Sequence, residues 1–377
     1  MMKSCIYPGS FDPITLGHLD IIKRAASMFE VVYVAVGNNS SKSGTFTVNE
    51  RMGLIGVASQ NIPNVKVVSF SGLLADFCYE LGCKVVIKGV RNFQDFDYER
   101  LLNDVGQTQQ SGIETITLFA KTELSHVSST ASKELLKYNG LVDGYVPLNV
   151  KEAMEIKMLE QRILGVTGEI GMGKSFFTKK LIRHAYVHFE HSPVIEIDLD
   201  KIGHDILHDR TEPVYVELRK NIIQEFSLKG DVIDRSSLGS IVFNDSVALG
   251  KLNSMMRIPM LTRIRKEVGN KKGLIVLNGA LLAEAGFLTL CNNNIIVINS
   301  PQEKQVEVLK KRGLSDEQVV RRIMSQMTTF NKIETIKKSI SDRGFGKLVL
   351  VENMYDEKNV SSIINSICLE SFSVKLS

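Results

Sequence analysis

Two short glycine-containing motifs of the kind that handle phosphate groups lie about 160 residues apart in this 377-residue chain. The first runs from Tyr7 to His18 with the sequence YPGSFDPITLGH, and the second runs from Gly165 to Ser175 with the sequence GVTGEIGMGKS. Each motif stands near the start of its own half of the chain. A chain of this length can form two domains with separate cores. The two motifs therefore predict two nucleotide enzymes joined end to end.

The composition is that of a globular protein that handles small anions. Hydrophobic residues make up 44% of the chain and charged residues 23%, which is typical of a globular domain. The net charge of +4 and the lack of a basic stripe do not favour a nucleic-acid binder. The five cysteines form no CxxC pair, and no apolar run approaches the roughly 18 residues of a membrane span. We expect no secretion signal, no membrane partner and a cytoplasmic location.

Short apolar runs alternate with amphipathic stretches in both halves. The expected strands cover residues 31–36, 65–68, 84–87 and 114–119, then 163–166, 194–197, 274–277, 295–298 and 348–351. The helices expected in the first half cover residues 17–29, 49–60, 73–81 and 95–110. Such alternation predicts an α/β fold with a parallel sheet in each half. We place the domains at residues 1–158 and 162–377, with residues 148–161 as a terminal helix, a linker, or both.

The first motif has the features of an anion-binding turn between a strand and a helix. Gly9 and Gly17 let the backbone approach a phosphate closely, and the following helix offers free N–H groups at its start. His18, in the first turn of that helix, would donate a hydrogen bond to a phosphate oxygen. The motif thus predicts a site that binds the phosphates of a nucleotide.

Several further motifs in the first half occur in the order of one known family. They are FTVNER at 46–51, FSGLL at 70–74, IKGVR at 87–91, DFDYE at 95–99 and VSST at 127–130. With the first motif, they make residues 1–158 resemble the bacterial phosphopantetheine adenylyltransferases, whose fold is a Rossmann-like nucleotidyltransferase domain. The resemblance implies that the phosphate of 4′-phosphopantetheine attacks the α-phosphorus of ATP and releases pyrophosphate. It also implies a homo-oligomer formed through this domain.

The resemblance assigns roles by motif position. His18, Lys42 and Lys88 would be catalytic, and the substrate would contact Ser10, Lys42, Leu74 and Lys88. The residues implied for ATP binding are Ser10, Phe11, His18, Gly89, Val90, Arg91, Glu99, Leu124, Ser125, His126, Val127, Ser128, Ser129 and Thr130. Lys88 stands where the family usually has arginine. A lysine keeps the positive charge but lacks the two-pronged hydrogen bonding of arginine. Residues 124–127 depart from the family's usual Trp-Ser-Phe-Ile run.

The second motif matches the phosphate-binding loop GxxxxGK[ST] between an expected strand and an expected helix. Its backbone N–H groups would hold phosphates, Lys174 would reach the β- and γ-phosphates, and Ser175 would ligate Mg²⁺. Asp198 and Asp200 follow the next expected strand, where ligands bind in open parallel sheets. One carboxylate would order Mg²⁺ through water, and the other would accept a hydroxyl proton.

Residues 162–353 resemble dephospho-coenzyme A kinase, which has a P-loop NTPase fold. The shared segments are the phosphate loop, the Asp-Leu-Asp run, ALLAE at 280–284, Ser300-Pro301 and residues 305–312 and 322–326. The resemblance implies transfer of the ATP γ-phosphoryl group to the ribose 3′-hydroxyl of dephospho-coenzyme A. The ATP-binding residues would be Gly168, Glu169, Ile170, Gly171, Met172, Gly173, Lys174, Ser175, Phe176 and Arg312. By motif position, the resemblance implies that Asp200 is the base and that Asp198 orders Mg²⁺ through water. Arg322 and Gln326 would lie near the nucleotide.

The second half departs further from its family. Val308 replaces the first arginine of the QxxRxxxR lid, and Arg257-Ile258-Pro259 replaces a His-Pro pair. An arginine at 308 would stabilise the transferring phosphoryl group, and Lys310, Lys311 or Arg321 would be its possible substitutes. The leading hypothesis is a bifunctional enzyme for the last two steps of coenzyme A synthesis. The alternatives are an adenylyltransferase fused to a weak or inactive module that senses a nucleotide or coenzyme A, or to a kinase with another acceptor.

Overall fold

The computed structural model describes residues 2–38, 44–109, 112–188, 193–242, 245–352 and 357–372. The chain divides into two compact units, Met1–Lys157 and Met158–Ser377. No helix among the described residues is long and apolar enough to cross a lipid bilayer.

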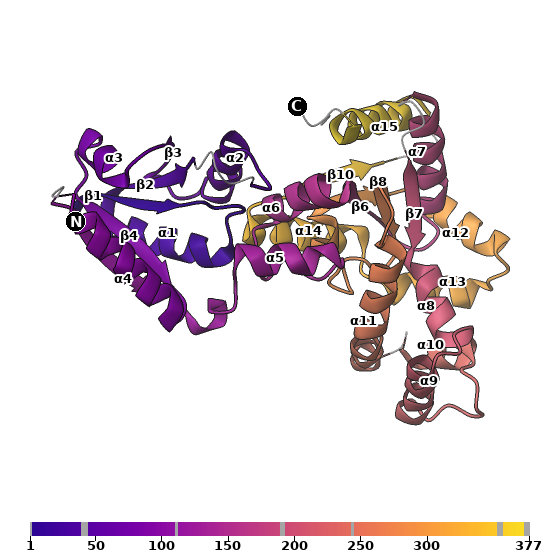
Figure 1. The fold of residues 1–377 in the computed structure, drawn as a ribbon. Coiled ribbons are helices and arrows are strands. Elements are labelled where there is room, and N and C mark those ends of the chain that lie inside the picture. The colour runs from indigo at the N-terminus through magenta and orange to yellow at the C-terminus, as the bar shows by residue number, and fades with distance from the viewer. Residues whose placement is uncertain are drawn as a thin grey trace. The chain divides into compact units, whose positions relative to one another are not determined.

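Five parallel strands form the sheet of the first unit (Figure 1). They are β1 (Met2–Gly9), β2 (Phe29–Gly37), β3 (Val65–Phe70), β4 (Val85–Val90) and β5 (Glu114–Phe119). Their order is β3-β2-β1-β4-β5, so the chain first builds outward on one side of β1 and then on the other. Ligands bind in open parallel sheets outside the carboxyl ends of the two strands where this reversal occurs. Those ends are Gly9 of β1 and Val90 of β4.

The helices of the first unit differ in how they begin: some have a capping side chain and others have none. They are α1 (Leu16–Met28), α2 (Val48–Ala58), α3 (Leu74–Glu80), α4 (Phe93–Gln107), the short η1 (Thr122–Leu124), α5 (Ser129–Lys137) and α6 (Leu148–Met154). Thr15 and Thr47 start α1 and α2 with reciprocal capping boxes. Asn92 and Ser128 cap α4 and α5. These caps fix the chain where strand ends turn into helices.

The helix expected over residues 148–161 is shorter than predicted. It comprises α6 and the π-helical turn η2 (Glu155–Leu159), and strand β6 already begins at Gln161. Gln161 is the first residue of this strand, and its buried side-chain amide donates to the carbonyls of Val268 and Lys271. Asn149 donates to the Leu54 carbonyl of α2, so the helix completes the first unit.

A second parallel sheet organises the other unit, in the order β10-β9-β6-β8-β7. Its strands are β6 (Gln161–Thr167), β7 (Val194–Asp198), β8 (Gly273–Asn278), β9 (Asn294–Ile298) and β10 (Lys347–Val351). Alternate residues of each strand enter two separate cores: Leu274 and Val276 face one, and Ile275 and Leu277 the other. Both faces are thus buried, which explains why these strands are continuous apolar runs in the sequence.

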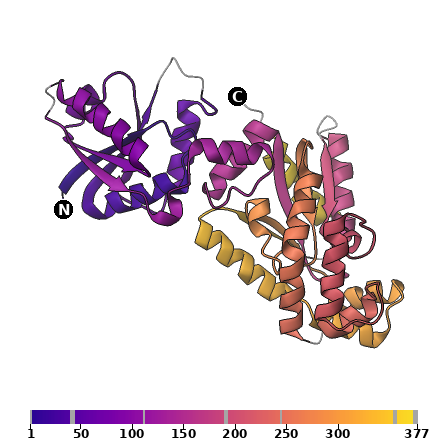
Figure 2. The ribbon, with the colours of Figure 1, turned by 60° about the horizontal axis from the view of Figure 1, so that its bottom comes forward.

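Helices cover both faces of this sheet (Figure 2). They are α7 (Lys174–His188), α8 (Leu199–His208), α9 (Pro213–Glu225), α10 (Arg235–Val242), α11 (Ser246–Val268), the short η3 (Leu288–Cys291), α12 (Gln302–Lys311), α13 (Asp316–Met324), α14 (Thr329–Arg343) and α15 (Glu357–Phe372). Helices α7 and α15 pack together on one face, and α8, α11 and α14 pack on the other. Helices α9 and α10 extend from α11 beyond the sheet (Figure 1).

Candidate active sites

The loop after β1 is held by contacts from several elements. Phe11 has a φ of 47°, in the left-handed region that is uncommon for an aromatic residue. Its buried ring meets the ring of His18 edge-on, with 5.2 Å between centroids. A Cβ on Gly9 would lie 2.9 Å from the Phe11 ring, so a larger residue there would displace the ring. Arg51 donates to the Ser10 carbonyl at 2.6 Å and fixes the next residue of the loop.

Asp12 joins this loop to the start of α2. Its carboxylate accepts hydrogen bonds from the backbone N–H groups of Thr45 at 2.8 Å and Phe46 at 2.9 Å. The hydroxyl of Ser129, in the first turn of α5, donates to the Pro13 carbonyl at 2.7 Å. The loop therefore contacts three segments distant in sequence. Lys42, expected to bind substrate phosphate, lies outside the described residues.

His18 is a neutral hydrogen-bond donor held in one orientation. The backbone N–H of Thr15 donates to His18 Nδ1 at 3.1 Å, so Nδ1 is an acceptor and the ring proton is assigned to Nε2. Burial, together with the nearby Arg91 charge, lowers the pKa of His18 to about 4. At neutral pH the ring is therefore uncharged and offers an Nε2–H group to a ligand.

The end of β4 supplies two cations, each paired with a carboxylate of α4. Lys88 Nζ lies 2.8 Å from Glu99 Oε2. Arg91 forms a two-pronged contact with Asp95, at 2.7 Å and 3.2 Å, and donates to the Val127 carbonyl at 3.3 Å. The hydrogen bond from Arg91 holds the pKa of Asp95 below its usual range. Helix α4 thus orients both basic side chains at the switch point.

A cavity of about 400 Å³ opens where these groups meet. The expected residues that line it are Ser10, Phe11, His18, Lys88, Gly89, Arg91, Glu99 and Val127 to Thr130. The expected residues outside its lining are Leu74, Val90, Leu124, Ser125 and His126. Leu74 packs against the core beside Cys78, Val90 is buried, and His126 meets the ring of Tyr145 edge-on.

Sequence reasoning missed several residues of this lining. They include Tyr7, Thr15, Ile21, Asp95 and Tyr98. Burial and the negative charge of Glu99 raise the pKa of Tyr7, so its hydroxyl stays protonated. Thr15 could have been found from its spacing to His18, which is that of a capping box. Asp95 could have been found from its position four residues after Arg91 on a helix start.

The phosphate loop after β6 adopts a backbone that only glycine favours at three positions. The φ angles of Gly168, Gly171 and Gly173 are 149°, 82° and 91°. Lys174 Nζ donates to the carbonyls of Gly168 at 3.2 Å and Glu169 at 3.1 Å, within the same loop. Burial lowers the pKa of Lys174 to about 8, although the carboxylate of Asp200 opposes this shift. The ammonium therefore remains mostly charged at neutral pH.

Asp198 and Asp200 lie on either side of a strand-to-helix junction. The strand ends at Asp198, whose carboxylate caps α8 by accepting from the Lys201 N–H at 2.9 Å. Asp200 is in the first turn of α8 and accepts from the Ala280 N–H at 3.3 Å. Burial raises the pKa of the Asp200 carboxyl, and the positive charge of Lys174 partly offsets this rise. A raised pKa brings a carboxylate closer to the range of a general base.

These groups line a cavity of about 750 Å³ that extends from the phosphate loop to α8, α10 and α11. The expected residues in its lining are Ile170, Gly171, Gly173, Lys174, Ser175, Phe176, Asp198, Asp200, Arg312, Arg322 and Gln326. Gly168, Glu169 and Met172 do not line it. Met172 is buried in the core, and a Cβ on Gly168 would lie 2.4 Å from the Ile298 carbonyl. The apolar far end of the cavity was not foreseen from the sequence.

The residues at which the second half departs from its family, Val308 and Arg257, both lie at the cavity. Val308 lines the cavity, as do Arg312 and Arg322. The proposed substitutes for an arginine at 308 do not line it: Lys310 pairs with Asp316, Lys311 with Glu307, and Arg321 with Glu317. Arg257 also lines the cavity, and its guanidinium donates to the Ala285 carbonyl at 2.7 Å. The charge on the lid side of this cavity thus comes from Arg312 and Arg322.

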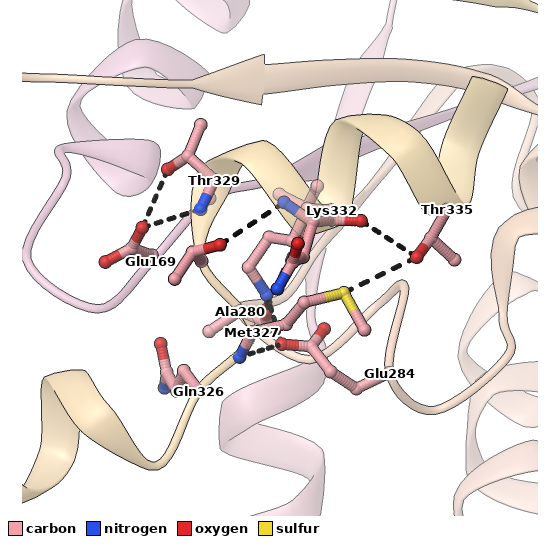
Figure 3. A network of polar contacts seen from close by, with 12 residues as sticks. Glu169, Ala280, Glu284, Gln326, Met327, Thr329, Lys332 and Thr335 are labelled. Atoms are coloured by element: carbon pink, nitrogen blue, oxygen red, sulfur yellow. Dashed lines mark hydrogen bonds and ion pairs between the residues drawn. The ribbon is translucent and has the colours of Figure 1, made fainter.

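A buried lysine joins α14 to the segment that follows β8 (Figure 3). The Lys332 side chain is fully buried, donates to the Ala280 carbonyl at 2.7 Å and pairs with Glu284. Glu284 also accepts from the Met327 N–H at 3.2 Å. Because Ala280 contacts Asp200, this pair holds one wall of the cavity.

We expect Lys332→Met to destabilise the second unit by about 3–5 kcal/mol, because Glu284 would keep a buried charge without its cation. Lys337→Met is the matched control, since Lys337 forms an exposed pair with Glu334 on the same helix; it should cost less than about 1 kcal/mol. Urea unfolding followed by circular dichroism measures both. Equal effects of the two substitutions would contradict the role given to Lys332.

The two sites define a class of protein: two nucleotide-dependent transferase domains, each on a parallel α/β sheet. Residues 6–135 match the family described as cytidylyltransferase-like, and residues 162–344 match the dephospho-CoA kinase family. A phosphopantetheine adenylyltransferase of Staphylococcus carnosus is 45% identical over 155 residues, which cover 41% of this chain and 96% of the relative. The chain belongs to the phosphopantetheine adenylyltransferase family through its first unit and carries a dephospho-CoA kinase domain in its second.

These families confirm the fold and the pair of transferase activities expected from the sequence: the last two steps of coenzyme A biosynthesis, both using ATP. Among solved structures, that of TT1252 from Thermus thermophilus is 24% identical and covers 56% of this chain and 98% of its own, with a TM-score of 0.41. The structure of NadR protein in complex with NAD and AMP-PNP is 13% identical, with a TM-score of 0.34. The match covers 100% of this chain and 98% of the NadR chain. The strand orders of the two sheets establish the fold.

Proposed function

We propose that the first unit catalyses adenylyl transfer by positioning and charge, without a general base. An oxygen of the 4′-phosphopantetheine phosphate would form a bond to the α-phosphorus of ATP, and the bond to the β-phosphate oxygen would break to release pyrophosphate. The nucleophile is already an anion, so the site must orient it and stabilise the charge that develops. The observation that carries this proposal is the His18 Nε2–H donor in one cavity with Lys88 and Arg91.

Each side chain then has a distinct role. His18 would hold the α-phosphate, Ser10 and Lys88 the substrate phosphate, and Arg91 with residues 128–130 the nucleotide. Glu99, through its ion pair, would orient Lys88 as well as contact ATP. Lys42 and Leu74 remain predictions from the family resemblance.

The assignment of Lys88 can be tested with two variants. Lys88→Ala should lower kcat/KM for 4′-phosphopantetheine by about 100-fold, because a charged contact to the reacting phosphate is lost. Lys88→Arg should retain most activity, since it restores the charge and adds a fork. Steady-state pyrophosphate release measures both. An alanine variant as active as the unchanged protein would remove Lys88 from the site.

We propose that the second unit uses Asp200 as the base that accepts the ribose 3′-hydroxyl proton. The freed oxygen would form a bond to the γ-phosphorus, and the bond to the β-phosphate oxygen would break to release ADP. Lys174 and Arg312 would neutralise the phosphate charge. The position of Asp200 beside Lys174 in the cavity supports this assignment.

The residues of this cavity fit a magnesium ion. Mg²⁺ favours one or two protein oxygens together with water and substrate phosphates, and Ser175 and Asp198 both line the cavity. We propose that Ser175 binds the ion directly and Asp198 through water. When bound, the ion would neutralise the β- and γ-phosphate oxygens. Phosphoryl transfer should stop when EDTA is added and recover with excess Mg²⁺; transfer that persists in EDTA would contradict this.

We propose that the first unit forms the contacts of a homo-oligomer through α4. No residue of α4 is buried, and Phe93, Leu101, Leu102 and Val105 are exposed. Such a patch is typical of an interface. Light scattering should give a mass of several chains, and Leu101→Glu should lower it. A single-chain mass for the unchanged protein would contradict the proposal.

We also propose a cytoplasmic location. It is supported by free thiols at three described cysteines, Cys5, Cys78 and Cys83. Fractionation of cells that express the chain would test this; recovery in the secreted fraction would contradict it.

A further inference from the structure

Glu169 places a carboxylate inside the phosphate loop, yet this side chain does not line the nucleotide cavity. It is nearly buried and turns toward the start of α14 (Figure 3). Its Oε1 accepts from the backbone N–H of Thr329 at 2.7 Å and from the Thr329 hydroxyl at 2.9 Å. Its Oε2 accepts from the side-chain amide of Gln305 at 3.3 Å. The partial positive charge at the start of a helix favours a carboxylate in this position.

The next loop residue is held on both sides of its backbone. The Gln305 amide also donates to the Ile170 carbonyl at 2.9 Å. The Ile170 N–H donates to the side-chain oxygen of Gln326 at 2.9 Å. Gln305 lies on α12, and Gln326 lies between α13 and α14. Residues that flank the arginines of the lid therefore bind two consecutive residues of the phosphate loop.

Helix α14, which receives the Glu169 carboxylate, is itself held to the segment after β8. One turn after Thr329, the buried Lys332 joins the helix to Ala280 and Glu284. Ala280 in turn contacts Asp200. The start of α14 thus connects the phosphate loop, the wall of the cavity and the end of the lid. A loop with three glycines in left-handed conformations can adopt many other backbone conformations. The contacts with α12 and α14 therefore determine where its N–H groups point.

We propose that Glu169 is a positioning residue for ATP: it fixes the phosphate loop to α14 and α12, and so orients the N–H groups that receive the triphosphate. The same contacts turn its negative charge away from the phosphates. This proposal rests on phosphoryl transfer by the second unit. The loop contacts ATP and not the acceptor, so the role of Glu169 concerns one of the two substrates.

The test compares KM values for the two substrates in the full chain. Glu169→Ala should raise KM for ATP in the second reaction by about tenfold, because three hydrogen bonds to a charged group are lost. KM for dephospho-coenzyme A should stay within about twofold. Glu169→Gln keeps an oxygen acceptor for Thr329 and should restore KM for ATP to within about threefold of the unchanged protein. Glu303→Ala, an exposed change on α12, is the matched control and should have no effect.

Coupling to Gln305 gives a second readout. If Glu169 and Gln305 act through the same anchor, the loss in kcat/KM for ATP in the double alanine variant should be far smaller than the product of the two single losses. The adenylyl-transfer rate of the first unit, measured in the same samples, should not change.

Three results would overturn the proposal: an unchanged KM for ATP in Glu169→Ala, an equal rise in KM for both substrates, or a fall in kcat alone with both KM values unchanged. The last would show a reduced fraction of folded enzyme. A second unit without any kinase activity would be recognised in the unchanged protein, before any variant is compared.

Discussion

Replacing Lys174 with alanine should stop the formation of coenzyme A while dephospho-coenzyme A accumulates. Lys174 is the cation of the phosphate loop, and in this structure its ammonium donates to two carbonyls of that loop. ATP phosphates would replace these carbonyls as its partners. Loss of a positive charge from a transferring phosphoryl group costs about 10³-fold in rate or more. The first reaction should proceed at its normal rate because its site lies in the other unit.

The pKa of Lys174 adds a pH dependence to this prediction. Burial lowers that pKa to about 8, and the ammonium is the form that binds phosphate. As pH rises through about 8, the free enzyme loses this proton. The kcat/KM for ATP in the second reaction should therefore fall above about pH 8.

Mass spectrometry of the products of purified Lys174→Ala measures the predicted loss. Lys179→Ala, an exposed change on the same helix, is the control and should form coenzyme A normally. Normal coenzyme A formation by Lys174→Ala would show that the second phosphate loop is not the kinase site.

Replacing His18 with alanine should have the opposite pattern: the first reaction is lost and the second is retained. The ring is neutral and its Nε2–H is fixed by the Thr15 contact, so the donor needs no rearrangement when charge develops on the α-phosphate. Removal of one such donor costs about 10²–10³-fold in kcat. The effect should be mainly on kcat, because the oxygen charge is largest in the transition state.

Pyrophosphate release from ATP and 4′-phosphopantetheine measures the first reaction, and addition of dephospho-coenzyme A with ATP measures the second in the same sample. His18→Asn, which keeps an N–H donor on a shorter side chain, should retain more of the first activity than His18→Ala. A loss of both reactions in His18→Ala would indicate misfolding, and retention of the first would contradict the assignment.

The strands of the second unit were predictable from the sequence because both faces of its sheet are buried. Runs such as residues 274–277 and 295–298 remain apolar throughout, and the structure places strands there. The phosphate loop and the His18 loop were equally visible, since both need glycine at fixed spacing. The strand order was not visible, because the pairing of β1 with β4 depends on contacts distant in sequence.

Charged and polar residues that lie inside the protein were the least predictable part. Three such residues are nearly or fully buried: Arg51, Glu169 and Lys332. Each forms a hydrogen bond with a residue far away in the sequence, and no local sequence pattern reveals such a contact. The helix ending at 159 was misjudged for the same reason: Gln161 is polar yet lies in the sheet. The role of Asp198 as the cap of α8 was not foreseen either, because only a metal or proton-transfer role was expected for it from the sequence.

The departures of the second half bear on how fast the kinase works. Val308 places an aliphatic side chain in the cavity where the family has an arginine, while Arg312 and Arg322 remain in its lining. We expect phosphoryl transfer to persist with these two cations. The alternative, a module that only senses a nucleotide or coenzyme A, differs from this account in one observable: it forms no product.

The most direct test gives the purified chain Mg-ATP and 4′-phosphopantetheine and follows the products by mass. This account predicts that dephospho-coenzyme A appears first and is then converted to coenzyme A by the same protein. Accumulation of dephospho-coenzyme A with no coenzyme A, even at high enzyme concentration, would contradict it.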